Sequence, residues 1–350
     1  MKLLFAAVCA LLLLLNAGHV ESRRHGDDGD YDSGRQYKLF VFGDEFADAG
    51  NYPLADLTKT TRAWYYPYGS NDKDHGTSPS GRFSNGLVLS DFVARIMGMK
   101  ESPPAERKRE QDGVDPSGMN FAVGGAGVVE GTHDAPKLGT QIDKFRRMVR
   151  HGIIDKDLTD SVALIAFSGK RDYARAADMT NSEVTAMAQD VTDKIASAVE
   201  QLTDLGVEKV LVSTLPPLGC TPWLSRSPSP GGGYDASCDG QKVASVHNAY
   251  LEEKVFKDKA VFNLDLKMMF KRLTAASGSN SKQFKYKQEP CCESVDQAGY
   301  CGQMDDGDAQ YTLCYKPDKY FYWDEINPTQ AGWKAVVEEL EESIKNFLHI

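Results

Sequence analysis

Lys38-Leu-Phe-Val-Phe-Gly-Asp-Glu-Phe-Ala-Asp-Ala-Gly-Asn51 is the stretch of sequence that decides the fold. Its first half is a short, continuously apolar run, which is typical of a strand buried on both faces of a parallel sheet. The run passes directly into the turn Gly43-Asp44-Glu45, at the end of a strand, where an α/β enzyme would display a nucleophile. The side chain displayed here is the carboxylate of Glu45.

Further strand and helix patterns alternate along the chain. Three more apolar runs, at 161–168, 207–215 and 259–266, predict buried strands. A stripe of apolar residues spaced three or four apart predicts a helix over about 182–205, and helices are also expected at about 240–257 and 329–347. The alternation predicts right-handed βαβ units and therefore an α/β fold with a mainly parallel, flavodoxin-like sheet between two helical layers. In such sheets ligands bind at the carboxyl ends of the strands, where Glu45 lies.

The first residues have the pattern of an export signal. Lys2 precedes an apolar run at 3–15, and the small residues Ala17 and Gly18 follow it. We expect a signal peptide at about 1–22, a loose polar terminus at 23–36 and one domain at 37–350. The apolar run is too short to span a membrane comfortably, and no second run of spanning length follows. The sequence thus predicts a secreted protein, extracellular or in a cell wall, with no transmembrane segment.

Charge and cysteine content narrow the choice of partners and of redox compartment. The formal net charge of −10 argues against nucleic acid or an anionic membrane as a partner. Once Cys9 leaves with the signal, the cysteines that remain are even in number, which in an exported chain favours disulfides. Six cysteines allow 15 connectivities, among which the sequence does not choose. No histidine lies at zinc-ligand spacing from them, and no metal or cofactor is expected. The disulfide candidates are Cys220, Cys238, Cys291, Cys292, Cys301 and Cys314.

A series of short motifs follows the opening stretch in a fixed order. They are Phe42-Gly-Asp44, Ser80-Gly-Arg-Phe-Ser-Asn-Gly86, Asn120-Phe-Ala-Val-Gly-Gly-Ala-Gly127, Ser168-Gly-Lys-Arg-Asp-Tyr173, Leu215-Pro-Pro-Leu-Gly-Cys220, His247-Asn248, Cys291-Cys292 and Trp323-Asp-Glu-Ile-Asn-Pro-Thr329. Together they cover nearly the whole mature chain, which resembles the plant GDSL esterase/lipase family within the SGNH hydrolases. The resemblance implies the three-layer α/β/α fold of that family and an ancestry in the hydrolysis of carboxylic esters, including lipid or cell-wall acyl esters.

The resemblance also implies a role for each chemical position, and three of the five roles have lost their residue. A serine hydrolase needs a hydroxyl nucleophile, a histidine base, a carboxylate that orients it and donors for the oxyanion. Glu45 stands at the nucleophile position, Asn327 at the base and Arg171 at the oxyanion-hole asparagine. Gly124 in the oxyanion hole and the acid Asp324 match the family pattern. We therefore expect no serine-esterase activity and a ligand-binding pseudoenzyme. The alternative is an active ester hydrolase or acyltransferase with a rearranged site.

Several interpretations of these positions stay open in the sequence. Glu45 and Arg171 could pair across the old pocket, or they could be separate charges on its rim. Glu45, Asp324 and Glu325 could instead form a paired-carboxylate glycosidase site. His247 and Asn248 are expected to hydrogen-bond within the structure rather than to supply a displaced base. The aromatic segment 64–68 could form the wall of a cleft that holds a small lipid, ester or carbohydrate. The sequence leaves the ligand and the oligomeric state undetermined.

Overall fold

The structure is a computed structural model that describes residues 36–109, 114–228, 233–235, 237–238, 242–275 and 282–350. The predicted signal peptide and all but the last residue of the predicted polar terminus lie outside the described residues. The described residues form one compact unit. Within the described part, no helix is both long and apolar enough to cross a membrane.

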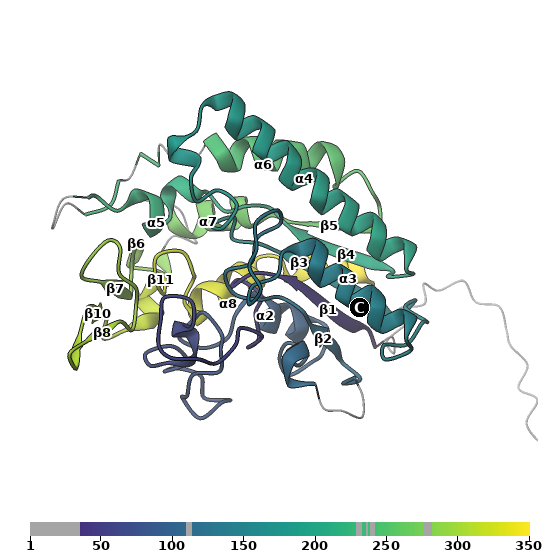
Figure 1. The fold of residues 1–350 in the computed structure, drawn as a ribbon, viewed down its shortest axis with the longest axis horizontal. Helices are drawn as coiled ribbons and strands as arrows, with labels where there is room; N and C mark the ends of the chain where they lie inside the picture. The colour runs from purple at the N-terminus through teal and green to yellow at the C-terminus, as the bar shows by residue number, and fades with distance from the viewer. Residues whose placement is uncertain (1–35, 110–113, 229–232, 236, 239–241, 276–281) are drawn as a thin grey trace, which may run out of the picture. The chain divides into compact units, whose positions relative to one another are not determined.

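A five-stranded parallel sheet forms the centre of this unit (Figure 1). Its strand order is β2-β1-β3-β4-β5, the order of a flavodoxin-like sheet. β1 pairs with β3 along its whole length, from Lys38 opposite Ser161 to Gly43 opposite Ala166. The strands are β1 Lys38–Gly43, β2 Gly118–Asn120, β3 Ser161–Ala166, β4 Lys209–Ser213 and β5 Val261–Leu264.

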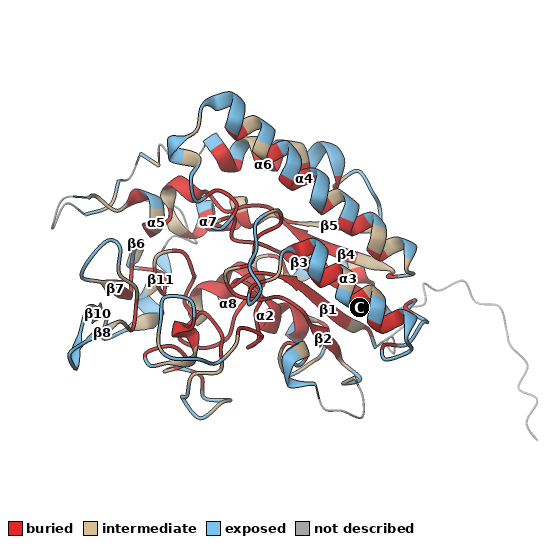
Figure 2. Ribbon diagram, in the orientation of Figure 1, coloured by how far each residue is buried: buried red, intermediate tan, exposed pale blue. Residues whose placement is uncertain are grey.

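Helices in two groups flank the sheet. α3 and α6 both contact α4, whereas α8 contacts α2 and α7, and α9 contacts α2 (Figure 1). Figure 2 shows that buried residues lie on the strands and on one side of each longer helix, with exposed residues on the other side. The predicted three-layer α/β/α fold is therefore confirmed. The helices are α2 Leu89–Ile96, α3 Leu138–Arg150, α4 Asn181–Asp204, α5 Pro222–Ser225, α6 Lys242–Lys254, α7 Leu266–Thr274, α8 Gln330–Glu338 and α9 Glu341–Leu348.

Short strands and disulfides build a second, smaller region near the C-terminus. β6 pairs with β11, β7 with β10 and β8 with β9. The expectation that the six cysteines form disulfides is confirmed, and the structure supplies the connectivity that the sequence left open: Cys220–Cys238, Cys291–Cys314 and Cys292–Cys301. The strands are β6 Tyr286–Pro290, β7 Cys292–Ser294, β8 Met304–Asp305, β9 Asp308–Ala309, β10 Tyr311–Leu313 and β11 Tyr320–Tyr322.

Candidate functional site

Two of the positions that the sequence analysis singled out, Glu45 and Arg171, follow the ends of β1 and β3, at the point where a sheet of this strand order binds ligands. Gly43 closes β1 with φ +149°, and a Cβ there would lie 1.9 Å from the Ala166 carbonyl oxygen. Only glycine therefore permits this close approach. The next residue, Asp44, accepts hydrogen bonds from the Ser168 amide (2.7 Å) and hydroxyl (2.6 Å). These bonds fix the turn after β1 against the segment after β3.

Glu45 is buried, and its carboxylate accepts a backbone N–H and lies beside a hydroxyl of the protein. The Gly125 N–H donates to Oε2 at 2.8 Å, and the Ser168 hydroxyl lies 3.2 Å from Oε1. Only 7% of Glu45 is exposed. Burial and then the charge of Glu45 raise the pKa of the neighbouring Asp44 well above its usual value. At the position where the family resemblance implies a nucleophile, the chain therefore has a carboxylate that accepts a hydrogen bond from a backbone N–H of the site.

Gly124, which the family resemblance assigns to the oxyanion hole, directs its amide to Asp48. Its N–H donates to Asp48 Oδ2 at 2.8 Å, and the amide that meets Glu45 is that of the next residue, Gly125. Asp48 is fully buried and also accepts the N–H groups of Gly50 and Asn51. Burial raises the pKa of Asp48 to about 6, although these hydrogen bonds oppose the shift. The turn therefore places the N–H of Gly125, and not that of Gly124, beside Glu45.

Asn327 and Asp324 form a hydrogen-bonded pair at the base and acid positions. The Asn327 side-chain amide nitrogen lies 3.0 Å from both carboxylate oxygens of Asp324, and its backbone N–H donates at 2.9 Å. An asparagine can thus donate a hydrogen bond to Asp324 as a histidine N–H would. Its other end is a carbonyl oxygen, which here is buried and has no hydrogen-bond partner among the described residues. That oxygen cannot act as a general base near neutral pH.

A charged network, which the sequence analysis missed, surrounds this pair. The Arg62 guanidinium lies 3.2 Å from Asp324 and 3.3 Å from Glu325, and the Lys170 ammonium lies 2.6 Å from Glu325. The Tyr68 hydroxyl donates to Asp324 at 2.7 Å. Burial opposes the ionisation of Glu325, but the charges of Lys170 and Arg62 outweigh it and hold the pKa of that carboxyl below its usual range. The interaction of Lys170 with Glu325 links the segment after β3 to the loop after β11.

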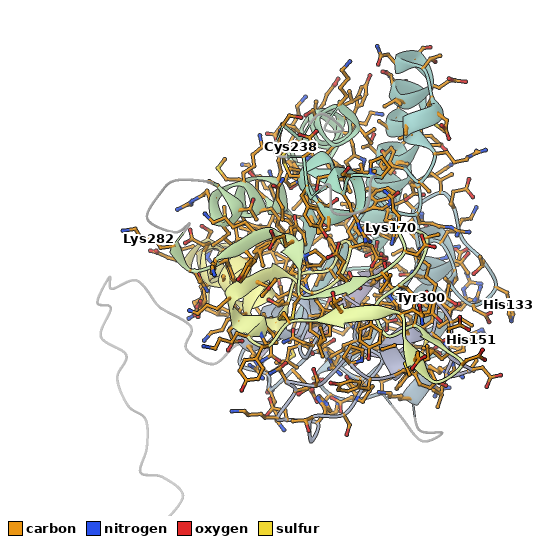
Figure 3. All side chains as sticks on the ribbon, turned by 90° about the vertical axis from the view of Figure 1, so that its left-hand side faces the viewer. His133, His151, Lys170, Cys238, Lys282 and Tyr300 are labelled. Atoms are coloured by element: carbon orange, nitrogen blue, oxygen red, sulfur yellow. A yellow bond between two sulfur atoms is a disulfide. The ribbon has the colours of Figure 1, made fainter. Side chains whose placement is uncertain are left out.

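Arg171 does not form the ion pair that the sequence suggested. Its side chain is exposed, and no ion pair joins it to Glu45 in the part of the chain that the structure describes. Lys170, one residue earlier and labelled in Figure 3, forms the ion pair with Glu325 instead. Glu45 instead accepts the N–H of Gly125.

His247 and Asn248 have the predicted structural role. His247 is buried, and its Nδ1 lies 2.9 Å from the Tyr173 hydroxyl. Asn248 accepts from the Leu215 N–H and donates to its carbonyl oxygen, both at 2.9 Å. Among the described residues, no group of three His, Cys, Asp or Glu side chains could hold a metal ion.

Comparison with known proteins shows the family of this chain. The model of the family described as GDSL-like lipase/acylhydrolase matches residues 39–340. GDSL esterase/lipase At5g03610 of Arabidopsis thaliana is 35% identical over 330 residues, which cover 89% of this chain and 87% of that protein. GDSL esterase/lipase At5g03600, also of Arabidopsis thaliana, is 33% identical over 328 residues, which cover 89% of this chain and 95% of the relative. The chain therefore belongs to the GDSL lipase/acylhydrolase family, whose reaction is ester hydrolysis.

Proposed function

We propose that this chain is an exported member of the GDSL family that does not hydrolyse esters by the serine mechanism. The observation that carries the proposal is the hydrogen bond between the Gly125 N–H and the carboxylate of Glu45. An active site of this kind keeps such a donor free for the oxyanion of the reacting ester. Here a side chain of the protein takes the donor, and the same side chain replaces the nucleophile.

The base position supports the same proposal. Proton removal from an attacking hydroxyl needs a group such as histidine, and Asn327 offers only an amide. Loss of the nucleophile or the base alone removes nearly all catalysis by a triad. The remaining rate is about 10³–10⁴ times that of the reaction in water. Both are replaced in this chain, so the expected residual rate is at or below that range.

The role that remains is binding. The family acts on esters, and we propose that a small lipid, ester or carbohydrate binds at this site without being turned over. The Lys170–Glu325 interaction crosses the site, and both side chains are less than one quarter exposed. A panel of short-chain esters, fatty acids and oligosaccharides, tested by thermal shift on the wild type and on Glu325→Ala, measures this binding. No shift with any compound on either protein would contradict a binding role at this site.

Hydrolysis of p-nitrophenyl acetate and butyrate, with labelling by a fluorophosphonate, tests the loss of activity. The secreted wild type is expected to give neither turnover nor label. The triple variant Glu45→Ser, Arg171→Asn and Asn327→His is expected to gain both, because it restores nucleophile, oxyanion donor and base. The double variant Arg171→Asn and Asn327→His, which keeps Glu45, is the matched control. It is expected to show neither turnover nor label. Turnover by the wild type that Glu45→Ala abolishes would overturn the proposal and support a rearranged hydrolase.

A further inference from the structure

A basic groove lies in the smaller region of the molecule, apart from the altered catalytic site. Its volume is about 590 Å³, within the range of ligand sites in proteins. Four lysines line it, although the whole chain has a formal net charge of −10. Figure 3 shows Lys282 at the outer edge of this face, well separated from Lys170. The lysines are Lys282, Lys285, Lys316 and Lys319.

Two chain segments form this groove, and backbone hydrogen bonds fix them together. The Lys285 N–H donates to the Lys319 carbonyl oxygen at 3.0 Å, and β6 pairs with β11 immediately beyond. The Lys319 N–H in turn donates to the Lys316 carbonyl oxygen at 3.0 Å. The groove is therefore held by the fold before any ligand arrives, which lowers the entropic cost of binding.

The lysines of the groove form no close ion pair within the described residues, although the side chain of Tyr286 and then the charge of Glu289 raise the pKa of Lys285. Among the described residues, none of the four lysines lies within ion-pair distance of a carboxylate. The Lys285 ammonium instead lies 4.7 Å from the centre of the Tyr286 ring. Lysines clustered in this way repel one another, so the groove favours an anionic ligand that separates their charges.

Aromatic rings provide the second property of this surface. The rings of Tyr286 and Tyr320 are stacked, with centroids 4.1 Å apart and planes 16° apart. Tyr315 also lines the groove and is 94% exposed, so its ring packs against almost nothing in the protein. Such rings offer flat faces with a polar hydroxyl at one edge, which suits a ligand that is itself partly apolar and partly hydrated.

We propose that this groove binds a linear polymer of uronic-acid sugars. The C–H face of each sugar ring packs on a tyrosine ring, and the carboxylate of each sugar meets a lysine ammonium. Lysine acts as a point charge without the fixed fork of arginine, so it tolerates the varied carboxylate positions of a flexible polymer. Such a polymer carries one charge per sugar. Duplex nucleic acid carries one negative charge per about 1.7 Å of its axis. An acidic protein repels this denser charge more strongly than it repels the sugar polymer.

Binding of polygalacturonate to the full secreted protein, measured by isothermal titration calorimetry at 50 and 200 mM NaCl, tests this proposal. The fully methyl-esterified polymer is the matched ligand control because it keeps the sugar rings and loses the charges. We expect binding of the acid form alone, weakened at the higher salt. Lys316→Ala with Lys319→Ala should weaken binding at least about tenfold. Tyr315→Ala should also weaken it, and Tyr315→Phe should not, because the ring is kept.

Lys257→Ala, at an exposed lysine outside the groove, controls for the loss of charge and should leave binding unchanged. Circular dichroism of each variant checks that it is folded; the affected side chains lie at the surface. The absence of polygalacturonate binding, equal binding by the groove variants, or equal binding of the methyl ester would each overturn the proposal. Tighter binding of poly(U) RNA or of phosphatidylserine vesicles at the same salt would also overturn it, in favour of another class of partner.

Discussion

The Lys170–Glu325 ion pair is the contact that joins the two altered segments of the site. Its side chains are 22% and 24% exposed, so water screens their attraction only in part. A double-mutant cycle with Lys170→Ala and Glu325→Ala should give a coupling energy of about 1–2 kcal/mol in urea unfolding. The exposed pair Lys334 and Glu338, 3.5 Å apart on α8, is the control and should give less than about 0.5 kcal/mol. Equal coupling in both cycles would contradict a special role for Lys170.

His247 predicts a specific response to acid. Burial lowers its pKa to about 3, so the folded state resists the proton that an unfolded histidine accepts near pH 6.5. The neutral ring thus contributes stability that is fully present above pH 6.5 and is lost as the pH falls toward 3. His247→Gln should remove up to about 1.4 kcal/mol per pH unit from the slope of unfolding free energy across that window.

Urea unfolding at intervals from pH 7 to pH 4 measures this slope for His247→Gln and the wild type. His151→Gln, at an exposed histidine, is the control. Its free energy of unfolding should change with pH as that of the wild type does. Parallel curves for His247→Gln as well would show that the buried ring does not resist protonation.

Single residues also show where sequence reasoning stops. The residues proposed for the nucleophile and base positions, Glu45 and Asn327, could be named because the motifs occur in a fixed order. The contacts of Arg62 and Lys170 could not be predicted, since both cations reach the acidic loop from segments more than 150 residues away in the chain. The choice of Lys170 over Arg171 depends on the direction in which the turn after β3 points each side chain. Composition and spacing carry no information about that direction.

Helix α4 depends on a capping box at its first turn. The Thr180 hydroxyl accepts the Glu183 N–H at 3.3 Å, and the Glu183 carboxylate accepts the Thr180 N–H at 2.7 Å. Thr180→Ala should therefore lower the free energy of unfolding by about 1 kcal/mol. Thr185→Ala, one turn into the same helix, is the matched control and should be neutral or slightly stabilising, since alanine has the higher helix propensity. Thermal unfolding by circular dichroism compares them, and equal effects would rule out the cap.

Elements with strong periodicity were predicted, and those that depend on tertiary context were not. The four apolar runs became β1, β3, β4 and β5, and the amphipathic stripe became α4. β2 has only three residues and is defined by its pairing with β1, which no local pattern reports. The single helix expected over about 329–347 is two helices, α8 and α9. Four glutamates lie within 338–342 at their junction, and like charges one turn apart disfavour a continuous helix.

The disulfide-bonded region is hydrogen-bonded to the segment that leads into the loop of Asp324 and Asn327. Cys291, Cys292 and Cys301 pack with Trp323 in a hydrophobic cluster separate from the main core. The Cys292 N–H donates to the Trp323 carbonyl oxygen at 2.7 Å, directly before Asp324. Loss of a disulfide in this region should therefore disturb the loop that holds Asp324 and Asn327. The central sheet has its own core and should persist.

Removing the two bonds one at a time separates their contributions. The bond Cys291–Cys314 joins residues 23 apart, whereas Cys292–Cys301 joins residues 9 apart. A longer loop gains more entropy in the unfolded chain when it is opened, so alanine at both cysteines of the first bond should cost about 0.8 kcal/mol more than at those of the second. Urea unfolding measures the difference, and limited proteolysis should cut within 291–314 before the sheet in either variant. Equal costs, or first cuts in the sheet, would mean that the region does not unfold independently.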